Sequence, residues 1–409
     1  MPLSAQGVEG VKGVLDSFIK DGSPGLVITA VDKSGNTLVE HAAGTVGVDS
    51  KDPMDKDKTI FWIASCTKLV TAIAVLQLVE QGKIALDDPD FVKKIAPEIQ
   101  EKKVYADGIN GADQEKDVTV SMLLSHTAGF AYGFFDPRIP KTDGLEGIDG
   151  DRNDIVNARL VNQPGSMWEY GVNIDWAGII LERVTGQTLG DYFAENLFKP
   201  LGINTGNISM FPTKETQENL AHMHQRDGEG KLTEREHLFK AALAQDTKEK
   251  QDKFFQAGGA GLFATPKEYI KILAAILNDG TSPTTGKTIL KKETVDLLWK
   301  NQIPDQPDFA RNGPPPVDAT LVNHAPEFYP QPGNPPQGWS YGGFLTIAPG
   351  PTGRGANTMW WMGLPNAFWW IDREKGVAGF LASQVLPNGD PKVIPAWFTA
   401  EKTIYDNLQ

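Results

Sequence analysis

Apolar positions recur every three or four residues between Val8 and Ile19, and this spacing predicts an amphipathic helix near the start of the chain. Two runs rich in β-forming residues follow, at 26–31 and 37–41. The five residues between these runs are polar or glycine, which is typical of a turn. We therefore predict a helix followed by a β-hairpin.

A second pattern, a long run of apolar residues, predicts a buried helix. Residues 69–79 are apolar on nearly every side of the helix that we predict from Ser65 to about Gln81. Gly82 ends this helix, and the strand-like run 61–64 leads into it. Because the helix has almost no polar face, we expect it to lie inside the protein.

The rest of the chain divides into a helical middle and a β-rich end. Helices are predicted at 118–125, 152–160, 174–184, 189–198 and 266–277. The segment 301–337 is rich in proline, so we predict a long surface loop packed over the body. Short runs of β-formers and aromatic residues predict successive antiparallel strands at 342–347, 357–362, 367–372 and 377–384.

These elements predict an α+β fold in which an antiparallel sheet is flanked by helices. We expect one catalytic unit over residues 1–409, in which 1–85 and 201–409 form an α/β lobe. Residues 86–200 would form an inserted helical lobe. A cleft between two such lobes is a natural place for a functional site.

The candidate chemistry begins with an S-x-x-K motif at Ser65–Lys68. Three residues make almost one helical turn, so the lysine amine is expected within reach of the serine hydroxyl. The start of a helix also offers free N–H groups to a developing anion. Ser17–Lys20 matches the same motif, but Ser17 lies within a helix, off its apolar face. Only Ser65 has the context that a nucleophile needs.

Several segments resemble class C β-lactamases and their relatives, the family VIII carboxylesterases. They are 61–68 (FWIASCTK), 82–88 (GKIALDD) and 123–129 (LLSHTAG). The segments 168–178 (WEYGVNIDWAG) and 365–372 (PNAFWWID) look most like the fungal lovastatin side-chain transesterase group. The similarity covers nearly the whole chain and implies a β-lactamase/transpeptidase-like fold.

The resemblance implies a role for several further residues. Tyr170 stands where this family keeps its catalytic tyrosine, which takes the serine proton and later protonates the leaving group. The third motif of the family falls at 361–363, so the backbone N–H groups of Ser65 and Leu364 are the expected oxyanion donors. No cofactor and no metal are needed for this chemistry.

Two departures from the family pattern bear on the substrate. Trp361 replaces the lysine or histidine with which β-lactamases meet the substrate carboxylate, and Val172 replaces an asparagine. Both changes favour ester hydrolysis or acyl transfer in an apolar pocket. The residues predicted to contact substrate are Trp361, Gly363, Asn173, Trp360 and Trp369.

Two other serine or histidine motifs occur in the sequence. Residues 338–342 fit the G-x-S-x-G pattern of α/β-hydrolases, but Ser340 enters a strand instead of a strand-to-helix turn. His126 is interpreted as part of a structural turn near the site. Two alternatives stay open: a β-lactamase or D-aminoacyl peptidase, and a catalytically silent binding protein of the same fold.

The charge and composition of the chain limit the classes of molecule that it is expected to bind. The formal net charge is −13 with no basic block, which argues against nucleic acid and anionic membrane as partners. The single cysteine, Cys66, excludes an internal disulfide, and no secretory signal or transmembrane run is present in this sequence, so a cytoplasmic location is expected. His222 and His224 are interpreted as solvated loop residues. We expect a small-molecule ester or acyl donor; the oligomeric state is not predicted.

Overall fold

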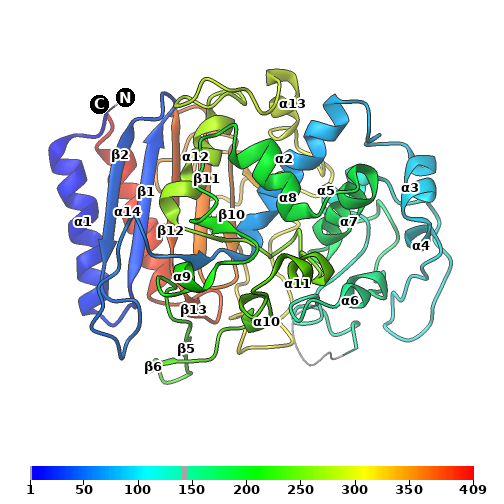
Figure 1. Cartoon of the computed structure of the whole chain (residues 1–409), viewed down its shortest axis with the longest axis horizontal. Coiled ribbons are helices and arrows are strands. Elements are labelled where there is room, and N and C mark those ends of the chain that lie inside the picture. Colours follow the sequence, from blue (N-terminus) through cyan, green and yellow to red (C-terminus); the bar gives the residue numbers. More distant parts are fainter. Residues whose placement is uncertain (1, 141–145) are drawn as a thin grey trace.

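A seven-stranded antiparallel sheet forms the centre of the computed structural model, which describes residues 2–140 and 146–409. The strand order is β2-β1-β12-β11-β10-β9-β8, so the N-terminal hairpin lies beside strands from the end of the chain (Figure 1). The bounds are β1 Leu26–Asp32, β2 Thr37–Ala43, β8 Gln337–Trp339, β9 Phe344–Thr346, β10 Thr358–Gly363, β11 Ala367–Asp372 and β12 Val377–Ala382.

Helices cover this sheet on both sides. Every residue of β11 and β12 is buried, which requires cover on each face. Helix α12 (Pro266–Leu277) packs on β1, β11 and β12, whereas α1 (Ala5–Lys20) packs against β2 and α14 (Val393–Asp406). The two chain ends meet beside α1, where the Gln409 N–H donates to the Pro2 carbonyl at 3.1 Å (Figure 1).

The middle of the chain is helical and lies at the opposite end of the molecule (Figure 1). Helix α7 packs between α2, α5 and α8, and α2 is buried along most of its length. The bounds are α2 Thr67–Glu80, α3 Pro89–Ile95, α4 Pro97–Gln100, α5 Val120–Leu124, α6 Arg152–Val156, α7 Asn173–Thr185 and α8 Leu189–Phe193, followed by a π-helical turn at Ala194–Phe198.

Shorter elements complete the fold. Two three-stranded sheets have the orders β13-β5-β6 and β3-β7-β4. Their strands are β3 Phe61–Trp62, β4 Ile208–Ser209, β5 His224–Arg226, β6 Leu232–Glu234, β7 Phe263–Ala264 and β13 Val385–Leu386. The remaining helices are α9 Lys214–Gln217, α10 Lys240–Leu243, α11 Lys248–Lys253 and α13 Lys292–Leu297.

The predicted α+β class, with an antiparallel sheet flanked by helices, is confirmed. The hairpin and the C-terminal strands occur where the sequence places them, with bounds that differ by a few residues. The division into lobes at residues 86 and 200 stays a prediction. The proline-rich segment contains no helix or strand before β8.

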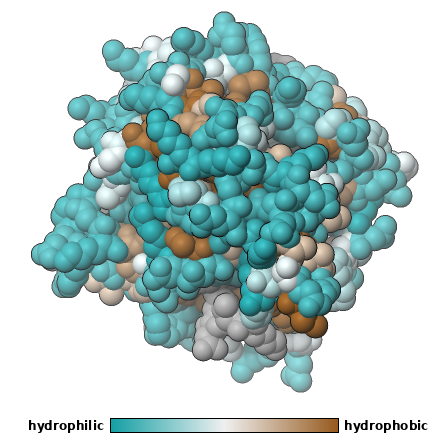
Figure 2. All heavy atoms as spheres, turned by 90° about the vertical axis from the view of Figure 1, so that its right-hand side faces the viewer, coloured by the Kyte–Doolittle hydropathy of each residue, from teal (hydrophilic) through white to brown (hydrophobic). Residues whose placement is uncertain are grey.

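No helix among the described residues combines the length and hydrophobicity needed to cross a bilayer. The face at the helical end of the molecule is mostly hydrophilic, with scattered hydrophobic residues (Figure 2). This surface agrees with the acidic composition of the chain.

Candidate active site

Ser65 sits in a tight turn between β3 and the buried helix α2. The turn is a 3-10 helix over Ala64–Cys66, and Ala64 has a φ of 42°, which is rare for a residue other than glycine. Neighbouring segments hold this turn: the Ile63 N–H donates to the Leu262 carbonyl at 3.0 Å, and the Tyr269 hydroxyl donates to the Cys66 carbonyl at 2.8 Å. The predicted helix start at Ser65 is therefore a 3-10 turn that continues into α2.

Lys68 lies one turn after Ser65, and its amine is near the serine hydroxyl as predicted. The Nζ–Oγ distance is 3.0 Å. The same nitrogen is 2.8 Å from the Gly259 carbonyl oxygen and 3.1 Å from the Tyr132 hydroxyl. Only 3% of Lys68 is exposed, so these three oxygens supply its polar contacts in an otherwise apolar interior.

Tyr170 comes from the segment before α7 and lies against the same amine. Its ring centre is 4.8 Å from the Lys68 Nζ, which is a cation–π distance. Its hydroxyl accepts a hydrogen bond from the Trp361 indole N–H at 3.0 Å. Among the described residues, no hydrogen bond joins Tyr170 to Ser65 or Lys68, although all three side chains converge on one place.

His126 lies behind Tyr170 and not at the reacting centre. Its ring centre is 4.8 Å from that of Tyr170, and its Nδ1 is 3.0 Å from the Asn173 Nδ2. Burial lowers the pKa of His126 well below its usual value, and the nearby Lys68 lowers it further. The side chain is therefore a neutral packing partner that holds the tyrosine, in agreement with the structural role predicted for it.

Sequence analysis missed Tyr132. It follows the turn at residues 126–129, and its hydroxyl touches Lys68 and lies 3.5 Å from the Asp175 carboxylate. Asp175 is buried in α7 and also accepts the Gly259 N–H at 2.9 Å. The sequence feature that could have identified Tyr132 is its position just after the turn at 126–129, which was expected to lie near the site.

The two tyrosines beside Lys68 differ in their surroundings. Burial raises the pKa of Tyr132 well above its usual value, and the Asp175 carboxylate adds to this shift. Tyr132 therefore stays protonated and serves as a hydrogen-bond donor. Tyr170 also lines the cavity, but its hydroxyl accepts the Trp361 indole N–H and contacts no carboxylate among the described residues.

The loop between β10 and β11 presents Leu364 to the cavity. Within the described part of the chain, the Leu364 N–H has no hydrogen-bond acceptor. The Asn388 side-chain amide is 3.2 Å from both the Gly363 and the Leu364 carbonyl oxygens, which orients this stretch of backbone. Ser65 and Leu364 both line the cavity, so their backbone N–H groups stay the predicted oxyanion donors.

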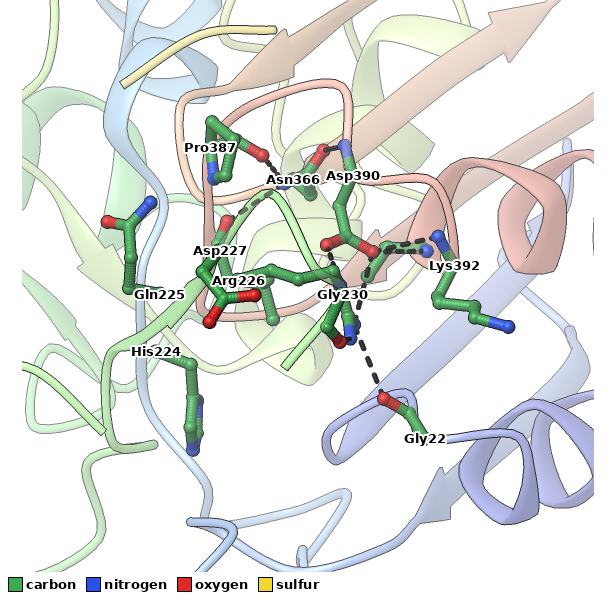
Figure 3. Close-up of polar contacts among 12 residues, drawn as sticks. Gly22, His224, Gln225, Arg226, Asp227, Gly230, Asn366, Pro387, Asp390 and Lys392 are labelled. Carbon is green, nitrogen blue, oxygen red and sulfur yellow. Dashed lines mark hydrogen bonds and ion pairs between the residues drawn. The ribbon is translucent and has the colours of Figure 1, made fainter. Parts of the chain in front are cut away.

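Asn366 anchors the same loop to the body of the protein (Figure 3). Its φ of 58° lies in the left-handed region, and its Nδ2 donates to the carbonyls of Val385 and Pro387 at 2.8 and 2.9 Å. Its Oδ1 accepts the backbone N–H groups of Gly389 and Asp390. The loop that carries Leu364 is thereby fixed at its base.

A buried ion pair extends this anchor (Figure 3). The Arg226 Nε is 2.6 Å from an Asp390 carboxylate oxygen, and the Arg226 guanidinium also donates to the carbonyls of Gly22 and Gly230. Asp390 caps the start of α14 by accepting the N–H groups of Lys392 and Val393. The support of the predicted oxyanion loop thus reaches three distant segments of the chain.

Two residues predicted to contact substrate, Gly363 and Asn173, do not line the cavity. A Cβ on Gly363 would lie 2.3 Å from the Ile63 carbonyl oxygen, so glycine is required there for close packing of β10 against the Ser65 turn. Asn173 is fully buried, and its amide contacts His126, Phe130 and Glu169. Both residues build the site from behind instead of facing a ligand.

Of the three tryptophans predicted to contact substrate, one lines the cavity and two do not. Trp361 lines the cavity, together with Trp62 and Trp168, and touches Tyr170. Trp360 and Trp369 are fully buried and absent from the cavity wall. Trp360 points to the face of β10 opposite to that of Trp361, whereas Trp369 pairs with Trp361 on the same face and is covered by neighbouring residues. The interpretation of these two as substrate contacts is corrected to core packing.

The cavity at Ser65 has a volume of about 950 Å³, enough for a large organic ligand. Its wall is mainly apolar and aromatic. The proline-rich segment 301–337, predicted only as a surface loop, supplies much of this wall through residues including Phe309, Val322 and Phe328. Its position explains how a segment without regular structure contributes to the site.

The competing motifs lie elsewhere. Ser340 is fully buried between β8 and β9, and its Oγ is 3.1 Å from the Gly343 carbonyl oxygen. His222 contacts Glu234 at 2.9 Å, whereas His224 is buried in β5, which corrects its prediction as a solvated loop residue. Across residues 2–140 and 146–409, no cluster of three or more histidine, cysteine or acidic side chains has the geometry of a metal site.

We predict that Trp361→Phe lowers kcat/KM for esters by about tenfold, because the Tyr170 oxygen loses its N–H donor. The measurement is hydrolysis of a p-nitrophenyl ester, with thermal unfolding recorded alongside. Trp360→Phe is the matched control: it removes the same indole from the core and is expected to lower Tm without a comparable loss of activity. Equal kinetic losses in both variants would contradict the role given to Trp361.

Comparison with known proteins agrees with the geometry. Residues 11–403 match the model of the beta-lactamase family. The chain is 30% identical over 384 residues to a lovastatin esterase of Penicillium rubens, with 90% of each chain covered. It is 29% identical over 405 residues to a monacolin J acid methylbutanoyltransferase of Aspergillus terreus, covering 94% of this chain and 92% of the relative.

Solved structures give the same result. A variant of simvastatin synthase from Aspergillus terreus superposes with a TM-score of 0.77 at 27% identity, covering 98% of this chain and 95% of the other. The resemblance inferred from the motifs is confirmed by these matches.

Proposed function

The chain belongs to the beta-lactamase family, and from that premise we propose that it is a serine carboxylesterase or acyltransferase that forms an acyl-enzyme on Ser65. The observation that carries the proposal is the 3.0 Å contact between Lys68 and Ser65 at the wall of a large apolar cavity. Similar relatives named as an esterase and as a methylbutanoyltransferase support both water and an alcohol as acceptor.

In the first half of the reaction, the Ser65 Oγ attacks the carbonyl carbon of the ester. Tyr170 reacts in this step as the phenolate: it takes the serine proton and becomes a neutral phenol, while the Lys68 ammonium donates to the Ser65 oxygen. The carbonyl oxygen becomes an oxyanion between the N–H groups of Ser65 and Leu364. The bond to the leaving alcohol then breaks, and Tyr170 returns the proton to that oxygen.

The second half reverses these steps with a new acceptor. Water or an alcohol enters beside Tyr170, which removes the acceptor proton as the acceptor oxygen attacks the acyl carbon. A second oxyanion forms in the same place, and the bond to the Ser65 Oγ breaks as the serine regains its proton. The products are a carboxylic acid or a new ester, and the enzyme returns to its starting state.

The nature of the wall argues against β-lactam hydrolysis as the main activity. Trp361 is the first residue of the third family motif, and its indole N–H donates to the Tyr170 hydroxyl. Because the indole is uncharged, it cannot form an ion pair with a β-lactam carboxylate. The two arginines of the cavity wall, Arg138 and Arg311, are each paired with acidic side chains. A neutral ester meets no such difficulty.

The test compares two substrate classes on one preparation. We expect measurable turnover of p-nitrophenyl esters and an acyl adduct on Ser65 in intact-mass spectra after brief exposure to a panel of short and long acyl esters. Turnover of nitrocefin is expected to be at least about a hundredfold lower in kcat/KM, because both arginines of the described wall are already paired with carboxylates. Nitrocefin turnover equal to ester turnover would favour the β-lactamase alternative.

The cytoplasmic location expected from the sequence stays a prediction. Fractionation of the native source, with antibody detection of the chain, is the direct measurement.

A further inference from the structure

One part of the cavity wall is rich in aromatic rings. The rings of Tyr132 and Phe134 stack with centres 5.0 Å apart, and those of Phe134 and Phe135 are 4.6 Å apart. Tyr170 adjoins this cluster, with its ring centre 5.3 Å from that of Tyr132. All four side chains line the cavity, and the faces of such rings attract cations.

A carboxylate lies within the same part of the wall. The Glu146 Oε1 accepts the Gly133 backbone N–H at 2.6 Å, which holds the side chain beside Tyr132 and Phe134. The Oε2 is buried and has no hydrogen-bond partner within the described part of the chain. A buried carboxylate oxygen without a partner is costly, and a donor on a bound ligand would remove that cost.

Among the described residues, no cation forms an ion pair with the Glu146 carboxyl. Burial raises the pKa of Glu146 above its usual value, and the Asp175 carboxylate adds to the shift. An ammonium group placed beside Glu146 would favour the ionised carboxylate and form a charge-assisted hydrogen bond or ion pair with it.

The remaining charges of the wall do not oppose a cation. Arg138 contacts Asp136 at 2.6 Å and Glu169 at 3.1 Å, so its charge is already offset. Arg311 is likewise held by Glu327 at 3.0 Å. The Lys68 amine donates hydrogen bonds to Ser65, Tyr132 and Gly259, and the Asp175 carboxylate lies nearby.

We propose that Glu146, Tyr132, Phe134 and Phe135 form a subsite for an ammonium group, so that the enzyme prefers esters carrying an amine or quaternary ammonium close to the reacting carbonyl. Tyr132 links the subsite to the reacting centre, because its hydroxyl contacts Lys68. The inference rests on the proposed function, since it takes Ser65 as the residue that is acylated. Glu146 is the specificity-determining residue.

The kinetic test uses two p-nitrophenyl esters of the same shape and spacer, one ending in trimethylammonium and the other in tert-butyl. Each kcat/KM is divided by the uncatalysed hydrolysis rate of that ester. We expect the unsubstituted enzyme to prefer the ammonium ester by about tenfold or more, mainly through KM. In Glu146→Gln, which keeps the shape of the side chain, this ratio is expected to fall close to one.

Asp149→Asn is the matched control. Asp149 is exposed and lies outside the cavity, so this variant changes the net charge equally without touching the subsite. It is expected to keep the ratio of the unsubstituted enzyme. A ratio of one or below in the unsubstituted enzyme, or an unchanged ratio in Glu146→Gln, overturns the inference.

A binding measurement separates this inference from the proposed function. Calorimetric titration of the Ser65→Ala protein with choline needs no turnover, and 3,3-dimethylbutan-1-ol, in which carbon replaces the charged nitrogen, is the comparison ligand. At least tenfold tighter binding of the ammonium supports the subsite even if no ester is turned over. Equal binding of the two ligands overturns the inference. Because this titration does not use Glu146→Gln, the result stands even if that variant fails to fold.

Discussion

Replacement of Ser65 by alanine is expected to abolish the acyl-enzyme and to lower kcat/KM for esters by at least about ten-thousandfold. The reason is chemical, because no other hydroxyl of the described cavity wall lies at hydrogen-bond distance from the amine of Lys68 except the phenol of Tyr132. Intact-mass analysis after ester addition and steady-state hydrolysis of a p-nitrophenyl ester measure both effects. The fold is expected to survive, because the alanine leaves the turn at residues 64–66 and helix α2 in place.

The chain contains its own control for this experiment. Ser17 opens a second S-x-x-K motif with Lys20, but it is exposed on α1. Ser17→Ala is expected to retain full acylation and full turnover. Ester turnover at the unsubstituted rate in Ser65→Ala, or loss of the adduct in Ser17→Ala, contradicts the assignment of the nucleophile.

Strong local patterns explain why most of the fold was predictable. The hairpin at 26–43, the buried helix after Ser65 and the strand at 367–372 each combine a run of apolar or β-forming residues with turn residues nearby. Pairing of the two chain ends in one sheet followed from the positions of their β-rich segments. The bounds were less accurate because caps and hydrogen bonds, such as the 3-10 turn before α2, decide where an element begins.

The candidate site was predictable where one helix or one motif determines the contact. Lys68 lies one helical turn from Ser65, so spacing alone brings the two groups together. Tyr132 was missed because only tertiary packing brings it to Lys68, across 64 positions in sequence. Trp360 and Trp361 are neighbours in β10, and their opposite sides of the sheet were not distinguished until the strand pairing was known.

The proline-rich segment illustrates a further limit of sequence patterns. Residues 301–336 contain no helix or strand, and the composition of this segment predicts a loop but not its position. In the structure, Arg311 of this segment pairs with Glu327, and Phe328 packs 5.7 Å from Trp361, measured between ring centres. These long-range contacts place an irregular segment against the catalytic wall and help to determine the shape of the substrate cavity.

Tyr170→Phe is expected to lower kcat/KM for esters by about a thousandfold, whereas Tyr132→Phe is expected to lower it by only about tenfold. Both phenols lie beside Lys68, but burial and Asp175 raise the pKa of Tyr132 and keep it protonated. Tyr170 also lines the cavity, but its hydroxyl contacts the Trp361 N–H instead of a carboxylate, and we propose it as the proton acceptor. The same substitution at two adjoining tyrosines therefore separates proton transfer from orientation of the lysine.

The comparison needs kcat/KM for a p-nitrophenyl ester and the rate of acyl-enzyme formation in a single turnover, with Tm measured for both variants. Loss of the acylation step in Tyr170→Phe at an unchanged Tm supports its role in proton transfer. A larger loss in Tyr132→Phe than in Tyr170→Phe would reverse the assignment, since the proton would then travel through the phenol that touches Lys68 directly. In that case Tyr170 would act mainly by shaping the cavity with Trp361.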